Sequence, residues 1–123
     1  MSLNNWNDQA FWNAIDTLVS SSKIIIDRPK GAHHPRFPSL VYPLDYGYLE
    51  NTTSMDGHGI DVWQGSLKPA TVTAIVCTID LQKRDSEIKL LVGCTSNEIE
   101  IIYHFYNQSD YMKGILIRRP SGS

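Results

Sequence analysis

The sequence predicts an α+β fold, mainly β, in which short strands form a small barrel and helices pack outside it. Several short runs are rich in β-branched residues, and the longest is TVTAIVCTIDL at 71–81. Two other segments, one near each end of the chain, repeat their apolar residues at the spacing of a helix face. With 41% hydrophobic and 20% charged residues, the 123-residue chain can bury a core, and we expect one domain over 1–123.

The first expected element is a helix over residues 7–20. Its apolar residues fall on one helix face: Trp6, Ala10, Phe11, Ile15, Leu18 and Val19. Asn5 or Asn7 would cap its start, and the serine run at 20–22 would end it. We expect this helix to lie across the sheet, and a partner-binding helix is the alternative.

A strand at 23–26, with the sequence KIII, is followed by a loop that contains two prolines. The loop also holds His33 and His34, whose side chains point in different directions in extended chain, so a shared metal is not expected. We expect both histidines to be exposed, and a position at the mouth of a site is the alternative. The chain is strand-like again at 40–42 and at 60–63.

The strand at 71–81 is expected to return at 88–92 across a charged turn. This hairpin would place Asp80 and Glu87 on either side of the turn and close to one another. Acidic side chains so placed would gather with others at one rim of the barrel.

A second helix is expected over 95–106, where Thr95 and Glu98 have the spacing of a capping box. Its apolar face would be formed by Ile99, Ile102, Tyr103 and Tyr106. A last strand at 114–119 then completes the expected set of elements.

The charge balance and the apolar pattern exclude several classes of protein. A net charge of −2 gives no general attraction to nucleic acid or to an anionic membrane, so neither is an expected partner. No run approaches the roughly 18 apolar residues of a membrane span, and the first residues do not resemble a signal peptide. We therefore expect a cytoplasmic protein. Cys77 and Cys94 lie in apolar surroundings without CxxC spacing, which predicts buried thiols.

The stretch from Tyr42 to Asp61 is the candidate for a chemical site. It contains three tyrosines around one proline and one glycine, and then Asp56 and Asp61 on either side of a tight turn. Aspartates that close together repel, so they usually require a cation, a shared proton or water between them. Carboxylates at strand ends are more often solvated turn residues, but their hard oxygens suit Mg²⁺ or Mn²⁺ better than zinc.

The order of motifs resembles that of the soluble family I inorganic pyrophosphatases. The segments that carry the resemblance are YPLDYGYLENT at 42–52, DGHGIDV at 56–62, and then Asp80 and Glu87-Ile88-Lys89. The resemblance covers roughly residues 24–105. It implies an OB-like five-stranded β-barrel, here with an N-terminal and a C-terminal helix, that hydrolyses pyrophosphate to two phosphates with Mg²⁺.

The resemblance also implies roles for individual residues. Four carboxylates match the metal ligands of the family, and Asp61 would bridge two metals that activate water: Asp56, Asp61, Asp80 and Glu87. Three residues match phosphate-binding positions: Arg36, Tyr46 and Lys89. Such a site would work mainly by positioning and by neutralising the charge of pyrophosphate.

The chain departs from the family pattern at the centre of its signature. His58 stands where the family has the aspartate taken as the general base, so His58 and Asp61 are the candidate catalytic residues. A neutral imidazole can accept a proton or bind metal, but it adds no negative charge. The early hairpin is also compressed, and Tyr111 and Lys113 are out of register with the late phosphate-binding pair of the family.

Two functions remain in view. The first is Mg²⁺-dependent hydrolysis of pyrophosphate or of a related small phosphoanhydride, with reduced efficiency. The alternative is a non-catalytic phosphate- or nucleotide-binding module that kept the fold. The sequence leaves open whether the chain forms a homo-oligomer.

Overall fold

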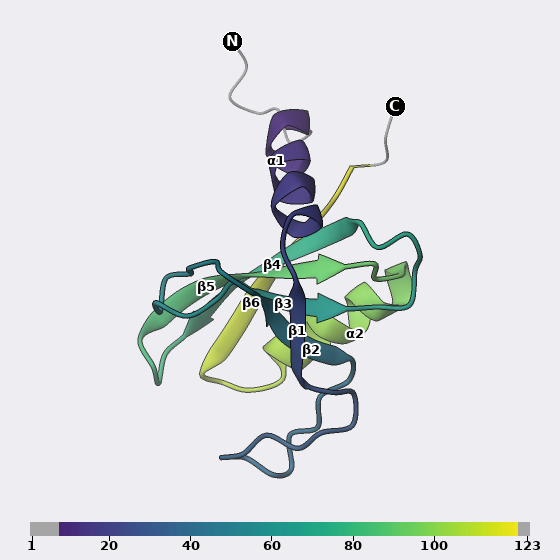
Figure 1. Cartoon of the computed structure of the whole chain (residues 1–123). Coiled ribbons are helices and arrows are strands. Elements are labelled where there is room, and N and C mark those ends of the chain that lie inside the picture. Colours follow the sequence, from purple (N-terminus) through teal and green to yellow (C-terminus); the bar gives the residue numbers. More distant parts are fainter. Residues whose placement is uncertain (1–7, 121–123) are drawn as a thin grey trace.

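The computed structural model describes residues 8–120, which form one mixed sheet and two helices (Figure 1). In chain order the elements are α1 (Gln9–Ser20), β1 (Ile24–Arg28), β2 (Asp45–Leu49), β3 (Asp61–Gln64), β4 (Val72–Asp80), β5 (Asp85–Val92), α2 (Ser96–Asn107) and β6 (Met112–Arg118). The strand order in the sheet is β1-β2-β3-β5-β4-β6. Neighbouring strands are antiparallel, except that β3 and β5 run parallel.

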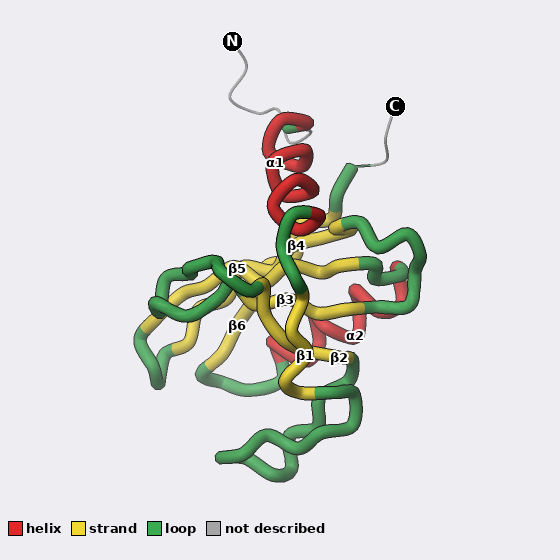
Figure 2. The backbone as a smooth tube through the Cα atoms, viewed as in Figure 1, coloured by secondary structure: helices red, strands yellow, loops and turns green. Residues whose placement is uncertain are grey.

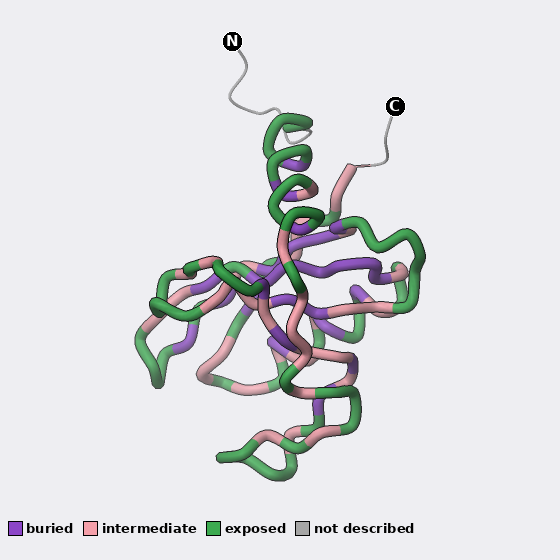
Figure 3. Tube along the Cα trace, viewed as in Figure 1, coloured by how far each residue is buried: buried purple, intermediate pink, exposed green. Residues whose placement is uncertain are grey.

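The sheet separates two hydrophobic cores, with one helix on each (Figure 1). Successive residues of a strand point to opposite faces, so Trp63 and Leu91 join the core under α2 while Val62 and Leu90 join the core under α1. Burial follows the same arrangement and is deepest in the central strands (Figure 3). The sheet face under α2 is the one that also carries the polar cluster described below.

Both predicted helices are present, with different starts. The cap of α1 is Asp8, whose Oδ1 accepts a hydrogen bond from the Phe11 N–H at 3.3 Å; Asn5, Trp6 and Asn7 lie outside the described residues. The capping box of α2 is confirmed, since the Thr95 and Glu98 side chains each accept from the other's backbone N–H. Within residues 8–120, no helix is long and apolar enough to cross a membrane.

The predicted α+β class is confirmed, and the sheet has six strands where five were expected. The region at 40–42 contributes only one bridge, between His33 and Val41, in the long loop that connects β1 and β2 (Figure 2). The strand in this part of the chain is β2, which lies further along, inside the tyrosine-rich stretch. A Cβ atom on Gly47 of β2 would lie 1.8 Å from the Ile25 carbonyl oxygen, so glycine is required for β1 to pair there.

The prediction of buried thiols is confirmed for Cys94 and not for Cys77. Cys94 is 1% exposed, and burial raises the pKa of its thiol to about 12. Cys77 is only partly buried and packs at the margin of the core under α1. Neither forms a disulfide.

Replacing Tyr106 by Phe should lower the free energy of unfolding by about 1–3 kcal/mol. The Trp63 indole N–H donates to the Tyr106 hydroxyl at 2.9 Å, and both side chains are buried. The variant leaves that indole N–H without an acceptor, which urea unfolding would measure. Tyr103→Phe is the matched control, since the part of the chain that the structure describes shows no hydrogen bond to its hydroxyl. Equal stability of the two variants would contradict this role of Tyr106.

Candidate active site

A buried lysine between carboxylates is the centre of the site. The parallel register of β3 and β5 pairs Val62 with Leu90, which puts Asp61 beside Lys89. Lys89 Nζ lies 2.5 Å from Asp61 Oδ2 and 2.5 Å from Glu87 Oε1. It also donates to the Tyr46 hydroxyl at 3.3 Å. These three contacts use the three N–H donors of the ammonium group.

The cluster is well shielded from water. Lys89 is 7% exposed and Glu87 is 9% exposed. Burial by itself lowers the pKa of Lys89, but the surrounding tyrosine oxygens and Asp61 outweigh it and raise that pKa. Burial also raises the pKa of the Tyr46 hydroxyl, so this group is a neutral hydrogen-bonding partner.

Asp56 joins the cluster through Glu87. The pKa of Asp56 is lowered, first by a hydrogen bond from the Glu87 carboxyl and then by the backbone N–H of His58. Burial raises the pKa of Glu87, which favours the protonated form that can donate this bond. When Glu87 is ionised, its buried Oε2 has no donor among the described residues. The pair therefore needs a proton or a cation between its carboxyl groups.

The turn that contains Asp56 also positions His58. Asp56 Oδ1 accepts from the Ser54 hydroxyl at 2.7 Å and from the His58 backbone N–H at 2.9 Å. His58 is exposed, and its ring is close enough to influence the charge of Asp56. The structure thus keeps the whole signature turn at the cluster.

Asp80 is committed to the hairpin rather than to the cluster. It is 6% exposed, and its Oδ1 accepts from the backbone N–H groups of Gln82 and Lys83 at 2.9 and 3.0 Å. In the hairpin, Asp80 pairs with Asp85 and Glu87 pairs with Thr78, two residue pairs further along. Asp80 and Glu87 therefore lie on the same hairpin, as predicted, but they do not contact one another. Across residues 8–120, no three His, Cys, Asp or Glu side chains are grouped closely enough to hold a metal ion.

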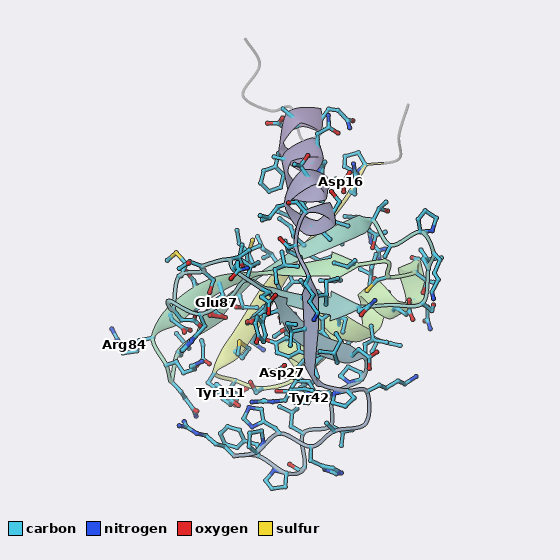
Figure 4. All side chains as sticks on the ribbon, viewed as in Figure 1. Asp16, Asp27, Tyr42, Arg84, Glu87 and Tyr111 are labelled. Atoms are coloured by element: carbon cyan, nitrogen blue, oxygen red, sulfur yellow. The ribbon has the colours of Figure 1, made fainter. Side chains whose placement is uncertain are left out.

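A cavity of about 530 Å³ adjoins the cluster on the α2 face of the sheet. Its basic lining residues are Arg28, His34, Arg36, Lys83 and Lys89, and its tyrosines are Tyr42, Tyr46, Tyr106 and Tyr111. Asp80 is the one carboxylate in this lining. Figure 4 shows Tyr42 and Tyr111 on the same side of the sheet, from the segments before β2 and before β6. The cavity is suited to a small anion.

The lining includes Arg28, Lys83 and Tyr42, which were not predicted as site residues, and His34, for which a place at a site was only the alternative. Arg28 donates to the Tyr42 hydroxyl at 2.7 Å and lies 5.5 Å from the centre of that ring. No local pattern marks Arg28 in the sequence, because its place depends on how the β1–β2 loop folds back. Arg36 was predicted, and it reaches the cavity from the same loop.

The two loop histidines have different surroundings. His33 is exposed, with Nδ1 2.6 Å from the Pro38 carbonyl oxygen. His34 is partly buried and lines the cavity, in line with the alternative of a position at a site.

Several solved structures share this architecture. An inorganic pyrophosphatase from Coxiella burnetii matches with a TM-score of 0.58 and 17% identity, over 78% of this chain and 84% of that one. An inorganic pyrophosphatase from Helicobacter pylori matches with a TM-score of 0.57 and 16% identity, over 80% and 85%. The chain has the fold of an inorganic pyrophosphatase. An inorganic phosphatase from Anaplasma phagocytophilum matches similarly, with a TM-score of 0.57 and 14% identity, over 78% and 83%.

The pyrophosphatase fold expected from the motif order is thus confirmed, while residue roles stay predictions at this level of identity. No protein-family model and no curated protein sequence matches the chain.

The loop that carries Arg36 should loosen at acid pH because His34 holds it as a neutral ring. His34 Nδ1 accepts from the backbone N–H groups of Arg36 and Phe37 at 3.1 and 3.3 Å. Burial, and then the charges of Arg28, Arg36 and Lys83, lower the pKa of His34. The stabilisation is complete above the unfolded-state pKa of about 6.5 and is lost as the pH falls through the lower folded-state value.

Amide hydrogen exchange followed by NMR would measure this effect. Exchange at Arg36 and Phe37, corrected for the intrinsic rate, should rise as the pH falls through the lowered pKa of His34, below the ordinary value of about 6.5. His34→Asn is the matched control, since an asparagine oxygen can accept the same bonds and does not titrate. Protection that is unchanged between pH 7.5 and pH 5 in the original chain would contradict the role of His34.

Proposed function

We propose that the chain hydrolyses inorganic pyrophosphate, or a related small phosphoanhydride, with the help of Mg²⁺ or Mn²⁺. The observation that carries this proposal is the junction between the basic cavity and the carboxylate cluster, where Lys89 and Tyr46 belong to both. A polyanion in the cavity would lie next to acidic oxygens that suit a divalent cation. The likeness to solved pyrophosphatases supports the same reaction class.

The donor set fits a divalent cation of this kind. Glu87 Oε2 is a buried acceptor that lacks a donor within the described chain, and the Asp56 carboxyl contacts the same residue. Mg²⁺ is commonly bound by one or two carboxylates, with water and substrate phosphates completing its shell. Because no three such side chains among residues 8–120 are grouped closely enough to hold a metal by themselves, Asp61 and Glu87 would hold the ion together with water and substrate phosphates. When bound, such an ion neutralises phosphate charge and makes water more acidic.

The other side chains would bind and orient the substrate. Arg28 and Arg36 offer planar donors for phosphate oxygens, and Lys83 adds charge at the hairpin side of the cavity. Tyr46 would donate its hydroxyl proton, since this group stays neutral. His58, exposed beside Asp56, would accept the proton of the attacking water as a neutral imidazole.

The second candidate is a phosphate-binding module without catalysis. It is favoured by Lys89, which already neutralises Asp61 and Glu87, and by Asp80, whose Oδ1 is committed to the turn. Such a protein would use the basic cavity alone. Single-domain organisation and a cytoplasmic location stay predictions from the sequence.

Asp61→Asn should reduce Mg²⁺-dependent phosphate release from pyrophosphate by about 100-fold or more, because it removes a charge beside both the lysine and the proposed metal. Glu50→Gln is the control, since it removes an exposed carboxylate outside the site. A colorimetric phosphate assay measures the rates. Pyrophosphate binding in calorimetry, with no release above a metal-only blank across several divalent ions, would establish the non-catalytic alternative.

His58→Asp should raise the rate of phosphate release several-fold if this position handles the attacking water, because a carboxylate adds negative charge and accepts a proton. The backbone N–H that caps Asp56 is kept in this variant. His33→Asp makes the same exchange in an exposed loop and should leave the rate unchanged. An unchanged or lower rate for His58→Asp would count against the proposed role.

A further inference from the structure

We infer that Lys89 is an internal counter-cation that competes with a divalent cation for Asp61 and Glu87, so that metal binding frees Lys89 for the anionic substrate. This inference rests on the proposed metal site. It adds a property that the proposed function does not require: metal and anion would each strengthen binding of the other through one side chain.

The first step is the hydrogen-bonding capacity of Lys89. An ammonium group has three N–H donors, and here they are directed to Asp61 Oδ2, Glu87 Oε1 and the Tyr46 hydroxyl. No donor is then left for a ligand in the cavity, although Lys89 lines it. In this state the lysine supports the carboxylates and contributes little to anion binding.

The second step is charge. Two carboxyl groups, on Asp61 and Glu87, face the single ammonium of Lys89. One positive charge cannot balance two ionised carboxylates, and the buried Glu87 Oε2 has no donor in the described chain. A divalent cation would serve these oxygens better than a single ammonium does. Lys89 contacts one oxygen of each carboxylate, Asp61 Oδ2 and Glu87 Oε1, and a divalent cation placed between the two groups would repel the ammonium from these oxygens.

The third step is the position of Lys89 between the two parts of the site. The other basic residues of the cavity do not pair with these carboxylates; Arg28, for example, donates a hydrogen bond to the Tyr42 hydroxyl. Lys89 is the basic residue that lines the cavity and also pairs with the carboxylates. Once released, its charge would be available to phosphate oxygens. Because binding free energies are linked, a metal that favours anion binding must be favoured by the anion to the same degree.

Metal affinity without any anion gives the sharpest test. Lys89→Met removes the competing charge but keeps an apolar stem of similar length, and we expect it to bind Mn²⁺ at least about tenfold more tightly than the original chain. Lys83→Met is the control, because Lys83 lines the same cavity without a salt bridge to the cluster. Calorimetry with Mn²⁺ alone measures all three affinities, after circular dichroism has shown that each variant is folded.

A second measurement uses the unaltered chain and does not depend on the variant folding. In protein carrying ¹⁵N-labelled lysine, the Nζ signal of Lys89 should shift during a Mg²⁺ titration, with the same midpoint as metal binding. Affinity for inorganic phosphate should rise at least several-fold when Mg²⁺ is present, and Lys89→Met should lose most of this rise while Lys83→Met keeps it.

The outcomes separate this inference from the proposed function. If the original chain and Lys89→Met bind Mn²⁺ equally, or the Nζ signal stays fixed while metal binds, the competition by Lys89 is overturned and the proposed metal site stands. If neither binds Mn²⁺, the proposed metal-dependent function fails, and the inference fails with it. If only Lys89→Met binds Mn²⁺, Lys89 has replaced the metal permanently, which supports the competition and favours the non-catalytic alternative.

Discussion

The site depends on one physical constraint: a charged lysine placed inside a folded protein must be paired. Lys89 is 7% exposed, and its ammonium is surrounded by the Asp61 and Glu87 carboxylates and by the Tyr46 hydroxyl. Removing Lys89 would leave the buried Glu87 carboxylate without a compensating charge, which typically costs several kcal/mol. The contacts of Lys89 therefore hold the four side chains together at one end of the cavity.

The sheet makes this arrangement possible because its two faces carry different sets of side chains. Leu90 and Val62 point into the core under α1, while Lys89 and Asp61 point to the other face, toward the α2 side. On that face the apolar core ends and the polar cluster begins within the length of one strand, since Leu91 of β5 is fully buried in apolar surroundings. The cavity lies at this boundary, so a ligand there would contact both aromatic and charged side chains.

The departures from the pyrophosphatase pattern gain physical meaning in this setting. His58 keeps the Asp56 turn intact through its backbone N–H, so the change from aspartate alters the charge of the site more than its shape. Arg28 and Lys83 add basic groups to the cavity that the compressed early hairpin no longer supplies. The cavity thus has more basic side chains than the sequence suggested, and Lys89 pairs with two of the carboxylates that were predicted to bind metal.

The sequence by itself determined the features that depend on neighbours along the chain. The capping box of Thr95 and Glu98, the hairpin after β4 and the turn between Asp56 and Asp61 all follow from local hydrogen bonds and short-range patterns. The motif order was specific enough to indicate the fold. Strand boundaries near β2 were missed because its polar, tyrosine-rich sequence lacks the alternation of a typical strand.

Only the tertiary structure decided what each charged group contacts. Asp61 and Lys89 are 28 residues apart and meet because β3 and β5 pair in parallel, a long-range choice that no local pattern encodes. Arg28 reaches the cavity because the β1–β2 loop folds back, while Asp80, predicted as a metal ligand, directs Oδ1 to its own turn. Local sequence fixes which groups are present, whereas the pairing of distant strands sets the distances on which their charges act.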